Sequence, residues 1–218
     1  MRSHILVYHA KGSNNKRRIR LRCKNNMKET DSFLMCDDSS HDGHHEAIMD
    51  YIISYTLRKT SSQFKETTPI LYGYCISIFA KLLEIEGKHD DISFENIIVS
   101  KQDCHIDLWV KVDVSKDNKT VHHELIIENK YLSKIRENAD GTCQLDDYKM
   151  VLDSKTTEDT IKHYAVICYH TKDQDHFKII KERADKCGFI TYSMSDLISI
   201  DSEDSESEIF NEFWLRNW

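Results

Sequence analysis

A carboxylate and an ammonium stand two positions apart at the end of an apolar segment, Ile126-Ile127-Glu128-Asn129-Lys130. On a β-strand, side chains two positions apart point to the same face and lie about 6–7 Å apart. Glu128 and Lys130 are therefore predicted to point together, while Asn129 points the opposite way. The spacing favours chemistry that needs an acid and a cation side by side.

A second carboxylate precedes this pair in the chain. Asp107 lies in an alternating segment, His105 to Val112, in which every second residue is apolar, as expected of a strand with one buried face. Asp107 and Glu128 offer hard oxygen ligands, which suit Mg²⁺ or Mn²⁺ with waters completing the shell. Lys130 would then assist an attacking water or stabilise negative charge on a phosphate. The alternative is a surface hairpin with a Glu and a Lys at its solvated end.

A glutamine and a tyrosine follow these strands in the chain. Gln144 and Tyr148 are four residues apart on a predicted helix, so they share one face and both reach a group held by the preceding strand. This spacing strengthens the interpretation of Glu128 as part of a site.

Alternating helices and strands must position these residues. Helical spacing predicts a helix from His44 to Leu57 whose apolar face includes Ala47, Ile48, Tyr51, Ile52 and Tyr55, and a buried helix from Ile70 to Ile85. The later predicted elements are strands at 97–100, 105–112 and 123–131 with a hairpin loop at 115–120, a helix from Thr142 as N-cap to about Leu152, a strand at 165–170, a helix at 173–186 and a strand at 189–192. This order describes an α/β sandwich around a mixed sheet.

These motifs together resemble the PD-(D/E)XK nuclease superfamily, and they are most similar to its bacterial and phage branch with an I-E-N-K and Q-L-x-x-Y signature. The resemblance implies a restriction-endonuclease-like α/β/α sandwich around a mixed central sheet. It also implies that Asp107, Glu128 and the Asn129 carbonyl bind Mg²⁺ or Mn²⁺, that Lys130 assists the water, and that Gln144 and Tyr148 orient the site or the nucleic-acid backbone.

The same branch has an acidic residue on its first helix. Aligning Ile48 to Ile53 with the apolar run of that helix places Asp42 at the acidic position, and Glu46 lies one helical turn later. Either residue is a candidate to complete the metal site. The alternative for both is a solvent-exposed helix start, where acids favour the helix dipole.

The resemblance covers roughly residues 42 to 150 and departs from the family at one named position, because Ile106 stands where the family has proline. We predict a basic N-terminal hairpin or arm at 1–30, a nuclease-like domain at 31–200 and an acidic and apolar tail at 201–218. The basic segment and the tail have no counterpart in the family pattern.

The net charge of −7 argues against a general nucleic-acid binder, but the charges are unevenly distributed. Nine basic residues and no acidic residue lie between Met1 and Lys28. The functional interpretation is an arm that contacts phosphates, and the alternative is a solvated β-hairpin that pairs loosely with the acidic tail. The candidate nucleic-acid contacts are Arg17, Arg18, Arg20, Arg22 and Lys24.

Composition excludes several other classes. No apolar run approaches a membrane span, the N-terminus lacks a signal-peptide pattern, and the seven cysteines form no C-x-x-C pair, so we expect a soluble cytoplasmic protein without a disulfide framework. The sequence contains no motif of a P-loop NTPase, an α/β-hydrolase or a zinc protease. His41, His44 and His45 form a weaker transition-metal candidate.

The sequence therefore predicts an endonuclease-type hydrolase that cleaves DNA in preference to RNA through a metal-activated water. One rival is a catalytically silent nuclease-fold module that acts by binding. Another is a self-associating protein that exposes the apolar tail segment from Ile209 to Trp218, and this segment also motivates the expectation of a homodimer.

Overall fold

The fold is taken from a computed structural model of the 218-residue chain. The structure describes residues 45–87, 91–169, 171–199 and 202–216. Several predictions fall outside these residues, namely those on the basic arm with Arg17, Arg18, Arg20, Arg22 and Lys24, and those on His41, Asp42, His44 and Trp218.

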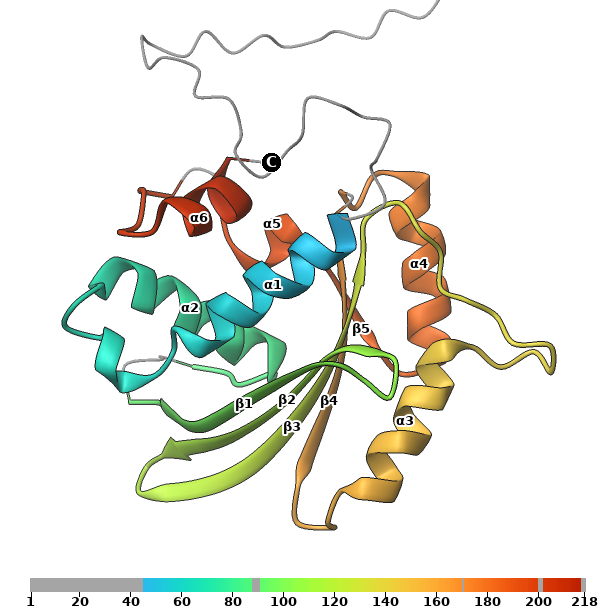
Figure 1. Cartoon of the computed structure of the whole chain (residues 1–218), viewed down its shortest axis with the longest axis horizontal. Coiled ribbons are helices and arrows are strands. Elements are labelled where there is room, and N and C mark those ends of the chain that lie inside the picture. Colours follow the sequence, from blue (N-terminus) through green and yellow to red (C-terminus); the bar gives the residue numbers. More distant parts are fainter. Residues whose placement is uncertain (1–44, 88–90, 170, 200–201, 217–218) are drawn as a thin grey trace, which may run out of the picture. The chain divides into compact units, whose positions relative to one another are not determined.

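A five-stranded mixed sheet forms the centre of the described residues (Figure 1). Its strands follow chain order and are β1 (Ser93–Asp103), β2 (Ile106–Lys116), β3 (Lys119–Lys130), β4 (Ile161–Cys168) and β5 (Ile190–Ser193). The first three strands pair antiparallel, whereas β4 and β5 run parallel to β3. This confirms the prediction of an α/β fold around a mixed sheet.

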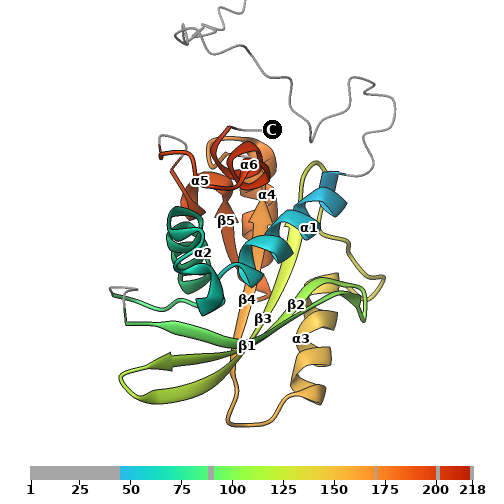
Figure 2. The same ribbon diagram turned by 60° about the vertical axis from the view of Figure 1, so that its left-hand side comes forward.

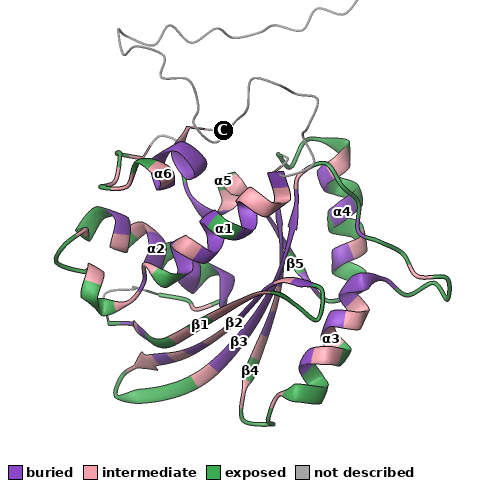
Figure 3. Ribbon diagram, in the orientation of Figure 1, coloured by how far each residue is buried: buried purple, intermediate pink, exposed green. Residues whose placement is uncertain are grey.

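Helices cover both faces of the sheet (Figures 1 and 2). One face carries α1 (His45–Arg58) and α2 (Pro69–Leu82), with a 3₁₀ turn at Ser62–Phe64 between them, and the other carries α3 (Gln144–Lys155) and α4 (Asp175–Lys186). Each face therefore has its own hydrophobic core, and buried residues line the sheet on both sides (Figure 3). Strand alternation explains this arrangement, since Leu108 and Val110 contribute to the α1 side while Trp109 contributes to the α3 side.

The hairpin between β2 and β3 is tighter than predicted. The expected loop at 115–120 is mostly strand, because Ser115 pairs with Thr120 and Lys116 with Lys119. Asp117 and Asn118 both have positive φ angles, 50° and 60°, which a two-residue hairpin turn of this type requires and which Asn and Asp tolerate well. The tight turn sets the pairing register that extends to the far end of the two strands.

The buried face of α1 also differs from the prediction. Tyr51, expected on the apolar face, is 64% exposed, whereas Asp50 is 2% exposed. Met49 and Ile53 are fully buried against the sheet. The helix is therefore rotated relative to the predicted face, and it carries a carboxylate into the core.

The N-cap of α3 is Cys143 rather than Thr142. The Cys143 thiol accepts a hydrogen bond from the backbone N–H of Asp146, and the Asp146 carboxylate accepts one from the backbone N–H of Cys143 at 2.9 Å. This reciprocal capping box satisfies two backbone donors at the start of the helix. Gln144 is consequently the first residue of α3.

The C-terminal segment packs into the α1 and α2 core through α5 (Met194–Leu197), α6 (Glu208–Phe210) and a π-helix at Asn211–Leu215. Phe210, Phe213 and Trp214 are at most 1% exposed, and Trp214 Nε1 donates to Thr56 Oγ1 at 2.9 Å. These three aromatic residues are therefore not an exposed self-association patch, and that interpretation is wrong. The expectation of a homodimer depended on their exposure, so this segment no longer supports it. Among the described residues, no helix is both long and apolar enough to span a membrane.

Candidate active site

Asp107 and Glu128 meet at the end of the β2–β3 ladder. Leu108 pairs with Ile127, so the next position along each strand brings Asp107 beside Glu128 on the face covered by α3. Asp107 Oδ2 accepts a hydrogen bond from the backbone N–H of Asn129 at 2.8 Å, and its Oδ1 accepts one from Gln102 Nε2 at 3.0 Å. These two hydrogen bonds hold the Asp107 carboxylate beside the end of β3.

The strand alternation predicted around Glu128 is confirmed. Lys130 Nζ lies 2.5 Å from Glu128 Oε1, and both residues are at most 5% exposed. Asn129 points to the opposite face, where it is fully buried beneath α1. The pair therefore forms a buried ion pair in which the acid and the base share one face.

Glu128 lies in an environment that favours binding of a cation. Its Oε1 accepts hydrogen bonds from Lys130 and from Gln144 Nε2, but its Oε2 is buried without a hydrogen-bond partner among the described residues. Burial, reinforced by the negative charge of Asp107 and opposed by Lys130, raises the pKa of Glu128 to about 8. A buried carboxylate oxygen that no described residue contacts through a hydrogen bond is suited to coordinate a hard divalent cation.

Gln144 and Tyr148 enclose Glu128 from α3, as their spacing predicts. Gln144 Oε1 accepts from the backbone N–H of Arg136 at 2.8 Å, which directs its amide group toward Glu128. The Tyr148 hydroxyl donates to the His105 carbonyl at 2.8 Å and lies 3.4 Å from Gln144 Nε2. Both side chains are buried, and Gln144 contacts Glu128 directly while Tyr148 contacts Gln144.

Glu46 lies near the site, at its Lys130 end. Its Oε1 accepts hydrogen bonds from the backbone N–H of Tyr131 at 3.1 Å and from Ser133 Oγ at 2.5 Å. Burial alone would lower the pKa of Lys130, but the charges of Glu128 and Glu46 raise it, so the ammonium stays protonated. Glu46 therefore holds the segment after β3 through two hydrogen bonds and stabilises the protonated form of Lys130.

A buried aspartate that the sequence analysis did not select completes this region. Asp50 Oδ1 accepts a hydrogen bond from Asn129 Nδ2 at 2.8 Å, and its Oδ2 lies 3.4 Å from Lys101 Nζ. The available signal was its spacing, because Asp50 follows Glu46 by one helical turn and shares its face. Three carboxylates, from Asp50, Asp107 and Glu128, thus surround the end of β3.

The Asp50 environment gives a prediction about pH. Burial, opposed by the hydrogen bond from Asn129, raises the pKa of Asp50 from 3.8 to about 6. Because the raised pKa means that the folded chain binds this proton more tightly than the unfolded chain, Asp50 destabilises the fold progressively as the pH rises through this window. We expect the unfolding free energy of Asp50→Asn relative to the parent to increase by ~2 kcal/mol between about pH 4 and pH 7.

Urea unfolding of Asp50→Asn and the parent at these two pH values measures this difference. Asp153→Asn is the matched control, because Asp153 is an exposed aspartate that also pairs with a lysine, Lys162. A difference between Asp50→Asn and the parent that does not change with pH would contradict the role assigned to Asp50.

The donor set fits a hard divalent cation. Asp107 and Glu128 supply carboxylate oxygens on one face, and a residue in a strand points its N–H and C=O to the same side. Since the Asn129 N–H points to Asp107, the Asn129 carbonyl also lies on that side. A cavity of about 410 Å³ beside α4 and β5 includes none of these three residues, so it is not part of this site.

No protein-family model, curated protein or solved structure matches this chain. The strongest feature is the convergence of Asp107, Glu128 and Lys130 from two adjacent strands, with Gln144 holding Glu128 in place.

Proposed function

We propose that this chain is a metal-dependent nuclease of the PD-(D/E)XK type, which hydrolyses phosphodiester bonds in DNA in preference to RNA. The observation that carries the proposal is the pairing of Lys130 with Glu128 beside Asp107, with Glu128 Oε2 buried and unpartnered among the described residues. Helices on both faces of a five-stranded mixed sheet are compatible with the restriction-endonuclease-like sandwich that the resemblance implies.

The residues of the proposed site have three roles: metal ligands, a positively charged group, and side chains that orient Glu128. Asp107, Glu128 and the Asn129 carbonyl would hold Mg²⁺ or Mn²⁺, which supplies Lewis-acid chemistry that activates water and stabilises negative charge on a phosphate. Lys130, whose ammonium is 2.5 Å from Glu128 Oε1, would orient the attacking water or a phosphate oxygen. Gln144 and Tyr148 keep Glu128 in one orientation.

The basic N-terminal arm is proposed to add phosphate contacts. Its candidate residues, from Arg17 to Lys24, lie outside the described residues, so the proposal depends on the clustering of positive charge in the sequence. The arm would contribute affinity and not chemistry.

Cleavage of labelled nucleic acids tests the proposed function. The purified protein is incubated with single- and double-stranded DNA and RNA in Mg²⁺, in Mn²⁺ and in a chelator, beside a Glu128→Gln preparation that controls for contaminating nucleases. We expect metal-dependent cleavage of DNA that the chelator abolishes and the variant lacks. Binding without cleavage in either metal would contradict the proposal and favour the catalytically silent binding module.

A further inference from the structure

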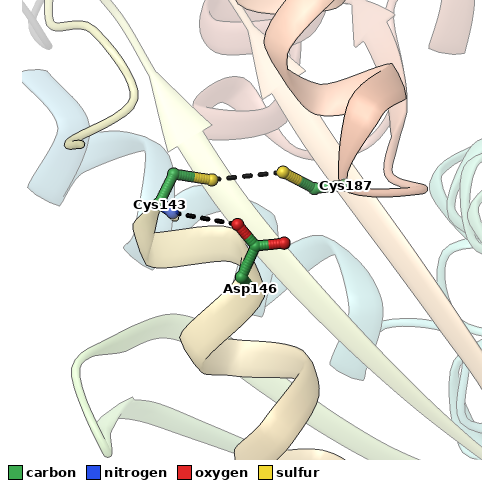
Figure 4. A group of neighbouring side chains, drawn as sticks. All are labelled: Cys143, Asp146 and Cys187. Atoms are coloured by element: carbon green, nitrogen blue, oxygen red, sulfur yellow. Dashed lines mark hydrogen bonds between the residues drawn. The ribbon is translucent and has the colours of Figure 1, made fainter. Parts of the chain in front are cut away.

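A second cluster of potential ligands lies between α3 and α4, apart from the carboxylates described above. Cys143 Sγ and Cys187 Sγ are 3.2 Å apart, and the Asp146 carboxylate lies beside them, where it accepts a hydrogen bond from the backbone N–H of Cys143 at 2.9 Å (Figure 4). One ligand atom from each of the three residues lies within 4.8 Å of the other two. Residues 44 positions apart thus bring two sulfurs and an oxygen to one point.

The other described cysteines have no comparable arrangement. Cys75 and Cys168 are buried in hydrophobic cores, and Cys104 is exposed. Cys143 is fully buried and Cys187 is 7% exposed, whereas Asp146 at the start of α3 is only partly buried. A partly open cluster of this kind allows an ion to enter while its thiols remain shielded.

We propose that Cys143, Asp146 and Cys187 bind one Zn²⁺ ion, with water as the fourth ligand. Thiolates and carboxylates are ordinary zinc ligands, and tetrahedral coordination suits a three-residue site of this composition. Each thiol releases its proton to solvent when the ion binds. The site is unrelated to the Mg²⁺ ligands proposed above, because zinc accepts sulfur whereas Mg²⁺ prefers oxygen.

The separation of the two sulfurs is closer to zinc coordination than to a disulfide. Tetrahedral bonds of about 2.3 Å place two sulfurs roughly 3.7 Å apart, so the observed 3.2 Å requires an outward adjustment of about 0.5 Å. A disulfide requires the sulfurs to approach to about 2.05 Å, which is a larger change.

The surrounding charges also fit a divalent cation. Two thiolates and one carboxylate carry three negative charges, which Zn²⁺ and a neighbouring guanidinium would balance. That guanidinium belongs to Arg183 on α4, which interacts with Cys143 and donates to the Gly141 carbonyl at 3.1 Å. Binding would also join the start of α3, where Gln144 follows Cys143, to the turn after α4.

Zinc titration of the full chain tests this site. The protein is reduced and stripped of metal, and bound zinc is counted by competition with a chromogenic chelator and by native mass spectrometry. We expect Cys143→Ser and Cys187→Ser each to bind one Zn²⁺ fewer than the parent, and Asp146→Asn to bind that ion at least tenfold more weakly. Cys104→Ser, which removes an exposed thiol, should bind the same number as the parent.

Two features of this design separate the site from other ligands and from misfolding. Counting the difference of one ion removes the contribution of cysteines and histidines outside the described residues, and Cys143→Ser retains a hydroxyl able to cap α3. Cobalt substitution should give sulfur-to-metal charge-transfer absorption that weakens in both serine variants. Equal zinc stoichiometry in the parent and these variants, or a Cys143–Cys187 disulfide in place of bound metal, would overturn the proposal.

Discussion

Glu128→Gln is expected to reduce Mg²⁺-dependent cleavage by about 10² or more, a typical loss when one strong electrostatic contribution is removed. The variant keeps the shape of the side chain and an oxygen that accepts from Gln144, but it removes the negative charge available to the cation. Lys130→Met, which retains most of the side-chain volume, should cause a loss of similar size because it removes the ammonium 2.5 Å from Glu128 Oε1. Initial cleavage rates across a Mg²⁺ titration measure both effects.

Glu124→Gln is the matched control for these variants. Glu124 is a buried glutamate on β3, and it pairs with Lys111 at 3.6 Å and with Trp109 Nε1 at 2.6 Å. It lies two strand repeats before Glu128 on the same face, so its replacement should leave cleavage within about threefold of the parent. Circular dichroism establishes that each variant is folded. Equal activity of the parent, Glu128→Gln and Lys130→Met would sink the proposed active site.

Asn129→Ala is expected to lower the thermal midpoint by roughly 5 °C, the equivalent of about 2 kcal/mol in a chain of this size. The substitution removes the Asn129 amide that donates to Asp50 Oδ1 at 2.8 Å. The buried Asp50 carboxylate then keeps its ion pair with Lys101 but loses this hydrogen bond. The strand position of Asn129 suggested that only its backbone matters, but its buried side chain links β3 to α1. Cleavage at about 25 °C should remain within about tenfold of the parent, because the backbone N–H and C=O persist.

A double-mutant cycle identifies the contact responsible. The loss caused by Asn129→Ala should be smaller in an Asp50→Asn background, because a neutral amide is less costly to leave without that donor than a carboxylate is. Asn138→Ala is the matched control, since Asn138 also donates to an aspartate, Asp147 at 3.1 Å, but lies in a partly exposed loop. Identical losses in both Asp50 backgrounds would show that the Asn129–Asp50 contact does not stabilise the fold.

Local periodicity was sufficient to predict much of the candidate site. The two-residue repeat of a strand places Glu128 and Lys130 on one face, whatever packs against it. The same repeat places Asp107 and Leu108, which are consecutive in β2, on opposite faces of the sheet. The four-residue repeat of a helix likewise brings Gln144 and Tyr148 together. These relations were predictable because each depends only on the conformation of its own segment.

Contacts between distant segments were decided by the tertiary structure. The apolar spacing of α1 allowed more than one buried face, and only packing against the sheet turned Asp50 inward to Asn129, 79 residues away. Packing likewise buried Trp214 against Thr56 and brought Cys187 to Cys143. The sequence by itself therefore determined which side chains share a face, whereas the rotation and docking of whole elements determined which faces meet, because those depend on the combined burial of many residues.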